Sequence, residues 1–111
     1  MKVSLNKNHW LEYQTYVNPN KIGLQTDSKK YSYLEIFELS KKTAEYFSQK
    51  GIKKNHHVSI YSENNFEFVI AINALWFLGA IPIPLNIRLK ENEIKKLLIH
   101  SQTSFLIVIN K

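Results

Sequence analysis

Residues 66–85 constrain the fold of this 111-residue chain most, because this stretch is apolar over almost its whole length. Its first part, residues 66–78, is preceded by Asn64, which has helix-cap spacing to Glu67, and is followed by Gly79, which is expected to end the helix. As a helix, this part is apolar on nearly every side. Such a helix in a soluble protein has to be covered on more than one face. A membrane span needs about 20 mostly apolar residues without breaks. The breaks in this stretch are Glu67, Asn73, Gly79, Pro82 and Pro84. We therefore expect a buried helix followed by a buried extended segment, and no membrane span.

Cap and stop residues predict three further helices. Ser32 and Glu35 have the spacing of a capping box, and Gly51 with Ile52 is typical of a helix end in which glycine adopts the left-handed conformation. The apolar stripe predicted for this helix consists of Ile36, Leu39, Thr43 and Phe47, flanked by Phe37 and Ala44. Shorter helices are expected at Trp10–Val17 and Glu91–His100, the second with Ile94, Leu97 and Leu98 facing inward.

Strand signals alternate with these helices. The predicted strands are Lys21–Gln25, Val58–Tyr61, Ala80–Pro84 and Phe105–Ile109, with a polar turn over residues 26–30. Pro82 and Pro84 cannot donate ladder hydrogen bonds, which limits the third strand to a sheet edge, a short strand or an irregular segment. The alternation predicts an α/β fold with a mostly parallel sheet and helices on both faces. Because no helix follows the last strand, we expect residues 1–111 to form a single, incomplete α/β unit.

Composition excludes several classes of function. The chain has no cysteine, which excludes disulfides and thiolate metal sites and favours a reducing compartment. The formal charge is +6, but Arg88 is the only arginine and the lysines are scattered, so we expect no nucleic-acid partner. The three glycines are isolated and form no phosphate-binding loop. The first ten residues lack a secretory signal, and the cytoplasm is the expected location.

The titratable residues suggest no catalytic or metal site. His56 and His57 are adjacent near the start of a strand, where neighbouring side chains point to opposite faces, so we expect a solvated turn rather than a metal site. The single aspartate, Asp27, excludes the acidic cluster of aspartyl-phosphate receivers. The remaining candidates have structural roles near helix ends: His9, His100, Glu91 and Glu93. We predict no catalytic, cofactor-binding or metal-binding residue.

Several motifs nevertheless follow one another in a specific order. Residues 31–36 read YSYLEI, an aromatic-Ser-Tyr-x-Glu motif that opens a helix, and residues 64–68 read NNFEF. Leu75–Leu89 contains Gly-Ala-x-x-x-Pro-Leu-Asn-x-Arg-Leu. With these motifs, Tyr31–Val108 resembles the N-terminal region of adenylate-forming enzymes, the acyl-CoA synthetase superfamily. Within it, the chain looks most like the ligases of menaquinone synthesis, on the basis of His9-Trp10-Leu11, Asn18-Pro19, Lys21-Ile22 and LNIRL.

Two positions depart from the family pattern, which puts the local turns in question. Asn55-His56 stands where the family has Gly-Asp, and Lys90 stands where it has a helix-capping residue. The resemblance implies that this chain corresponds to about the first quarter of a carboxylate–CoA ligase. Such a ligase uses ATP, Mg²⁺ and coenzyme A, and its phosphate loop, ribose-binding aspartate and adenylation lysine lie downstream.

By resemblance, the chain is therefore scaffold for a ligase and inactive alone. Asn86 and Arg88 are its structural-loop candidates, with the Arg88 side chain expected to donate to backbone carbonyls. The expected partner is the remainder of the ligase, or a second copy bound through exposed apolar surface. A stand-alone small α/β protein-interaction module is the alternative.

Overall fold

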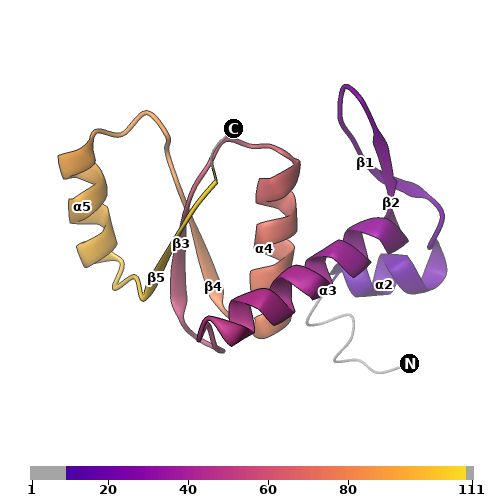
Figure 1. Ribbon diagram of the computed structural model, residues 1–111, viewed down its shortest axis with the longest axis horizontal. Helices are drawn as coiled ribbons and strands as arrows, with labels where there is room; N and C mark the ends of the chain where they lie inside the picture. Colours follow the sequence, from indigo (N-terminus) through magenta and orange to yellow (C-terminus); the bar gives the residue numbers. More distant parts are fainter. Residues whose placement is uncertain (1–9, 110–111) are drawn as a thin grey trace.

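The computed structural model describes residues 10–109, which form a layered α/β arrangement (Figure 1). The elements are α2 (Trp10–Val17), β1 (Ile22–Gln25), β2 (Lys30–Ser32), α3 (Tyr33–Gln49), β3 (His57–Tyr61), α4 (Phe66–Leu78), β4 (Ile81–Leu85), α5 (Glu91–His100) and β5 (Phe105–Val108). His9 lies outside the described residues.

Strands β4, β3 and β5 form a parallel sheet in that order. Helices α3 and α4 cover one face of the sheet and α5 lies on the other, which confirms the predicted α/β fold (Figure 1). Pro82 and Pro84 of β4 pair with Val58 and Ile60 of β3, and β4 is an edge strand of this sheet, one of the placements predicted from its prolines. The fully buried Val58 and Ile60 of β3 face the core against α4.

The N-terminal strand does not join this sheet. β1 pairs antiparallel with β2, and the two make a separate hairpin beside α2, at the end of α3 that lies away from the sheet (Figure 1). The expectation that all strands belong to one sheet was therefore wrong for residues 22–25. β2 is difficult to predict from the sequence because this strand has only three residues and its last residue, Ser32, also caps α3.

Helix α3 begins and ends at the predicted signals. Ser32 Oγ accepts a hydrogen bond from Glu35 N (3.1 Å), and Glu35 Oε1 accepts one from Ser32 N (2.9 Å). At the other end, Gly51 has φ +101°, and Ile52 N donates to Phe47 O (3.1 Å). These bonds form a Schellman motif, in which only glycine adopts the left-handed position without strain. Ile52 is buried, as the predicted packing onto the last turn requires.

The buried face of α3 is rotated from the predicted stripe. Leu39 is 38% exposed, whereas Ser40 is fully buried, together with Ile36, Ala44 and Phe47. Small side chains are buried here because α3 packs against α4, whose Ala71 and Ala74 belong to the same core as Ala44. Hydrophobicity alone favours Leu39, but close helix packing selects small residues.

Replacing Ser32 by alanine is expected to destabilise the chain by about 1 kcal/mol, because the Glu35 amide loses its acceptor at the start of α3. The measurement is urea unfolding followed by circular dichroism. Ser48→Ala is the matched control, since Ser48 is an exposed serine in the last turns of the same helix. Equal unfolding midpoints for the two variants would show that the capping box contributes nothing.

Helix α4 is covered from two sides, as its composition predicts. Leu75 packs into the core between α3, α4 and the sheet, while Ile70 packs with Leu11 and Ile36 in a second core near α2. The N-cap is Asn65, whose Oδ1 accepts from Phe68 N (2.8 Å), so the prediction of Asn64 was wrong by one residue. Gly79, with φ +76°, ends the helix as predicted.

Helix α5 has the predicted bounds but little packing. None of its residues is buried, and Leu97, predicted to face inward, is 40% exposed. Glu93 Oε1 accepts from Lys90 N (2.8 Å), which is the carboxylate hydrogen bond of a capping box. This bond forms although the N-cap residue is a lysine. No helix among the described residues is long and apolar enough to cross a membrane.

Candidate functional site

The carboxyl ends of the parallel strands are the edge where α/β sheets generally bind ligands. The loop after β4, residues 86–90, lies at this edge and holds both loop candidates. Asn86 Oδ1 accepts from Arg88 N (2.9 Å), and Leu89 N donates to Asn86 O (3.1 Å). Tyr61, the last residue of β3, donates from its hydroxyl to Ile87 O (2.9 Å). Asn86 therefore fixes the turn with its own side chain, and Tyr61 ties this turn to the centre of the sheet.

Arg88 takes part in the same turn. Its backbone N–H donates to Asn86, while the side chain is exposed and makes no hydrogen bond to any residue within 10–109. Donation from the guanidinium to backbone carbonyls stays a prediction. The guanidinium stays available at the carboxyl edge.

A partly buried hydroxyl network at the opposite edge was missed by the sequence analysis. Ser59 Oγ lies 2.6 Å from Thr103 Oγ1, which lies 2.8 Å from Ser101 Oγ. His57 Nδ1 lies 2.6 Å from Ser101 O. These contacts connect β3 to the turn between α5 and β5, and Ser59 is fully buried. A serine inside an otherwise apolar strand was the signal that could have indicated such a partner.

The histidine pair lies at the start of β3. Among the described residues no group of three His, Cys, Asp or Glu side chains could hold a metal ion. However, neither histidine is simply solvated. His56 Nδ1 accepts from Lys53 N (2.9 Å), and His57 is half-buried at the start of β3. His100 is exposed at the end of α5.

The turn that contains His56 also explains how the family's Gly-Asp sequence is replaced. Asn55 adopts φ +71°, a left-handed conformation that asparagine tolerates better than most residues. Asn55 N donates to Gly79 O (2.9 Å). The departure from the family pattern at this turn is therefore accommodated without loss of the turn.

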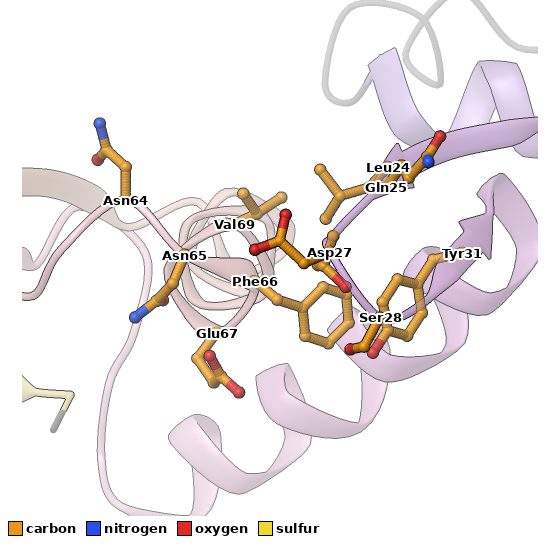
Figure 2. Close-up of a pocket in the computed structure, with 11 residues that line it drawn as sticks. Leu24, Gln25, Asp27, Ser28, Tyr31, Asn64, Asn65, Phe66, Glu67 and Val69 are labelled. Atoms are coloured by element: carbon orange, nitrogen blue, oxygen red, sulfur yellow. The ribbon is translucent and has the colours of Figure 1, made fainter. Parts of the chain in front are cut away.

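A cavity of about 560 Å³ lies between the β1–β2 hairpin and the start of α4 (Figure 2). The rings of Tyr31 and Phe66 stack with centroids 4.0 Å apart, and Figure 2 shows them face to face between the hairpin and the helix. Asp27 and Glu67 also line this cavity. The cavity combines segments about 40 residues apart, and no local pattern in the sequence predicted it.

A second cavity, about 320 Å³, is an apolar groove between α3, α4 and the end of β5. Its lining consists of Leu39, Thr43, Tyr46, Phe47, Phe66, Glu67, Ile70, Ala71, Ile107 and Ile109. We call it the α3–α4–β5 groove. Leu39, which the predicted stripe placed on the buried face of α3, lines this groove.

The conformations of the glycines indicate whether the described residues could form a phosphate-binding loop for a nucleotide. Gly51 and Gly79 adopt positive φ at helix ends, and a Cβ on Gly23 would lie 2.6 Å from the Tyr33 ring. All three glycines thus have packing or helix-end roles and cradle no phosphate. The described residues do not fit an ATP or Mg²⁺ site.

Comparison with known proteins identifies relatives over nearly the whole chain. Residues 11–111 match the family model described as AMP-binding enzyme. The 2-succinylbenzoate–CoA ligase of Oceanobacillus iheyensis is 31% identical over 100 residues, which are 89% of this chain and 21% of that ligase. The ligase of the same name from Bacillus thuringiensis is 24% identical over 86 residues, 78% of this chain and 18% of the relative.

Solved structures agree in fold. O-succinylbenzoate coenzyme A synthetase (MenE) from Bacillus subtilis in complex with AMP superposes with a TM-score of 0.88 and 28% identity, covering 90% of this chain and 26% of that chain. The same enzyme in complex with ATP and magnesium ion gives 0.89 and 27%, covering 92% and 28%. The N-terminal subdomain of NpsA from Klebsiella oxytoca gives 0.85 and 26%, covering 88% and 26%. The chain spans about a fifth of the curated relatives that it matches.

Proposed function

The chain belongs to the AMP-binding enzyme family, and from this membership we propose that it is the N-terminal part of an ATP-dependent carboxylate–CoA ligase acting on 2-succinylbenzoate. The observation that carries the proposal is the 31% identity over 100 residues to a 2-succinylbenzoate–CoA ligase. The similarity to the O-succinylbenzoate coenzyme A synthetase of Bacillus subtilis, solved in complex with AMP, supports the same substrate class.

The proposed reaction has two steps. The substrate carboxylate attacks the α-phosphorus of ATP, which releases pyrophosphate and leaves an acyl-adenylate. The thiolate of coenzyme A then attacks the acyl carbon and displaces AMP, so that a thioester forms. The residues of 10–109 do not fit a phosphate or Mg²⁺ site, and we assign the groups that hold ATP, Mg²⁺ and coenzyme A to the rest of the ligase.

The role of this chain in the proposal is to build one wall of the ligase and to hold its loops in place. Asn86 and the Tyr61 hydroxyl fix the turn at the carboxyl edge of the sheet. Arg88 is presented from that turn with a free guanidinium, which is suited to a carboxylate or a backbone carbonyl of the remaining ligase. We assign no catalytic residue to this chain, and a cytoplasmic location belongs to the same proposal.

A chimeric ligase tests this function. Residues 11–111 of this chain, which match the family, replace the corresponding segment of the Oceanobacillus iheyensis ligase, and 2-succinylbenzoyl-CoA formation from ATP and coenzyme A is measured. We expect a folded chimera with thioester formation within about tenfold of the parent, since the replaced segment supplies packing rather than reacting groups. The parent ligase without the segment is the control and should be inactive.

A chimera that folds but makes no thioester with 2-succinylbenzoate would contradict the proposal. A stand-alone interaction module, the other function considered, predicts that the segment fails to replace its counterpart at all.

A further inference from the structure

Helix α2 contacts the rest of the chain through a narrow side that is partly polar. Leu11 is fully buried and belongs to the core that includes Ile36 and Ile70. One turn later on the same side, the Thr15 hydroxyl donates to Leu11 O (2.8 Å) and lies 3.3 Å from Tyr33 O. A surface helix usually buries an apolar stripe and exposes its polar residues. Because a threonine follows Leu11 on the inner side, most apolar residues of α2 lie on the other side of the helix.

That other side of α2 is aromatic and exposed. Trp10, Tyr13 and Tyr16 follow one another at every third position and are 47%, 39% and 73% exposed, and Val17 is 44% exposed. We call these four residues the α2 outer face. The glutamate, glutamine and threonine of the helix are all less exposed than these four. Tryptophan and tyrosine are enriched where proteins associate, because their rings bury a large apolar area. The α2 outer face is therefore suited to bind a protein surface.

Charge indicates which partner this face fits. The chain has a formal net charge of +6, so two copies repel each other wherever their lysines come close. Residues 10–20 contain no lysine or arginine, and Glu12 is their only charged residue. In a two-fold contact the same patch meets itself, so a patch with several like charges repels its own copy. The α2 outer face carries no charge and is complementary to itself. It also lies at the end of α3 that points away from the parallel sheet (Figure 1).

We propose that the α2 outer face binds a second copy of this chain, with the rings of the two copies packed around a two-fold axis. The inference does not depend on the proposed function. A fully covered aromatic side chain buries about 150–250 Å², so at these exposed fractions the three rings of one copy have roughly 300 Å² left to bury. Two copies bury roughly 600 Å² through their rings, less than the roughly 1,200 Å² at which stable interfaces begin. The dimer is therefore reversible, with a dissociation constant in the micromolar range or weaker.

Sedimentation equilibrium of the complete chain tests this contact. We expect a reversible equilibrium between a monomer of 13.1 kDa and a dimer of twice that mass, and a tighter dimer at higher salt, which screens the repulsion between the two basic chains. Tyr16→Lys places like charges on both sides of the contact and should weaken the dimer about tenfold or more. Ile99→Lys is the matched control, since it adds the same charge at an apolar residue of α5 that is 79% exposed. It should leave the dissociation constant nearly unchanged.

Tryptophan fluorescence locates the contact without adding a charge. The chain has two tryptophans, Trp10 on the α2 outer face and Trp76 on α4. In Trp76→Phe, the emission of Trp10 should move to shorter wavelength as the protein concentration rises, because the contact removes water from the ring. In Trp10→Phe, the emission of Trp76 should stay constant over the same range. All four variants should retain the circular dichroism of the original chain.

Three results would overturn the inference. One is a chain that stays monomeric up to millimolar concentration. Another is a dimer that Tyr16→Lys leaves unchanged, because the contact would then lie on a different surface. The third is equal weakening by Tyr16→Lys and Ile99→Lys, which would mean that association depends on net charge rather than on α2. None of these results bears on the activity of the chimeric ligase, so the proposed function is tested separately.

Discussion

Purified on its own, the 111-residue chain is expected to show no ATP–pyrophosphate exchange above background with 2-succinylbenzoate. Enzymes lower activation barriers by about 8–23 kcal/mol, and for charge that develops on phosphate most of this comes from preorganised groups around it. The three glycines of this chain are all occupied in helix ends and side-chain packing. The chain also spans only about a fifth of its curated relatives, so most groups of the proposed site lie outside it.

The measurement is incorporation of labelled pyrophosphate into ATP, with the complete Oceanobacillus iheyensis ligase as the positive control. A second sample contains the chain together with the remaining part of that ligase, where exchange should appear if the two associate. Exchange that co-elutes with a 13.1 kDa monomer would contradict the prediction and would require a nucleotide site within this chain.

Local signals made the helices predictable from the sequence. The capping box at Ser32 and Glu35 and the glycine ends at Gly51 and Gly79 depend on residues only a few positions apart, and all of them are confirmed. Such signals act through hydrogen bonds of the first and last turns, so they do not depend on the surrounding fold.

Tertiary packing determined what the sequence did not reveal. Periodicity selects the most apolar face of a helix, but contact between α3 and α4 buries Ser40 and leaves Leu39 at the edge of a groove. Similarly, the apolar residues of α5 fit an amphipathic pattern although none is buried. A pattern gives the face that a helix is suited to bury, whereas burial itself requires a neighbouring element.

The loop candidates show the same limit at the carboxyl edge. Asn86 was identified because its motif resembles a family sequence, and its turn depends on a bond between residues two positions apart. The backbone partner predicted for the guanidinium of Arg88 is not found within residues 10–109, so that role stays a prediction. Tyr61, which does reach the loop, is 26 residues away from its acceptor Ile87 O, a distance at which no local pattern is informative.

Replacing Leu75 by alanine is expected to unfold much of the chain at room temperature. Leu75 is fully buried in the last turn of α4, in the core shared with Val58 and Ile60 of β3. Truncation of a buried leucine removes apolar contacts and leaves a cavity, at a cost of about 3–5 kcal/mol. The total stability of a small domain is about 5–15 kcal/mol, and the incompletely covered α5 and β5 favour the lower end of this range.

The loss of Leu75 should therefore reduce the urea midpoint by more than half, as measured by circular dichroism at 222 nm. Leu97→Ala is the matched control: it removes the same atoms from α5, where the leucine is 40% exposed, and should change the free energy of unfolding by less than about 1 kcal/mol. Equal losses at the two positions would mean that α5 is packed as closely as α4. An exposed leucine without close neighbours buries little apolar surface, so its truncation should cost little free energy. A large loss at Leu97 would therefore mean that the face of the sheet under α5 is well covered.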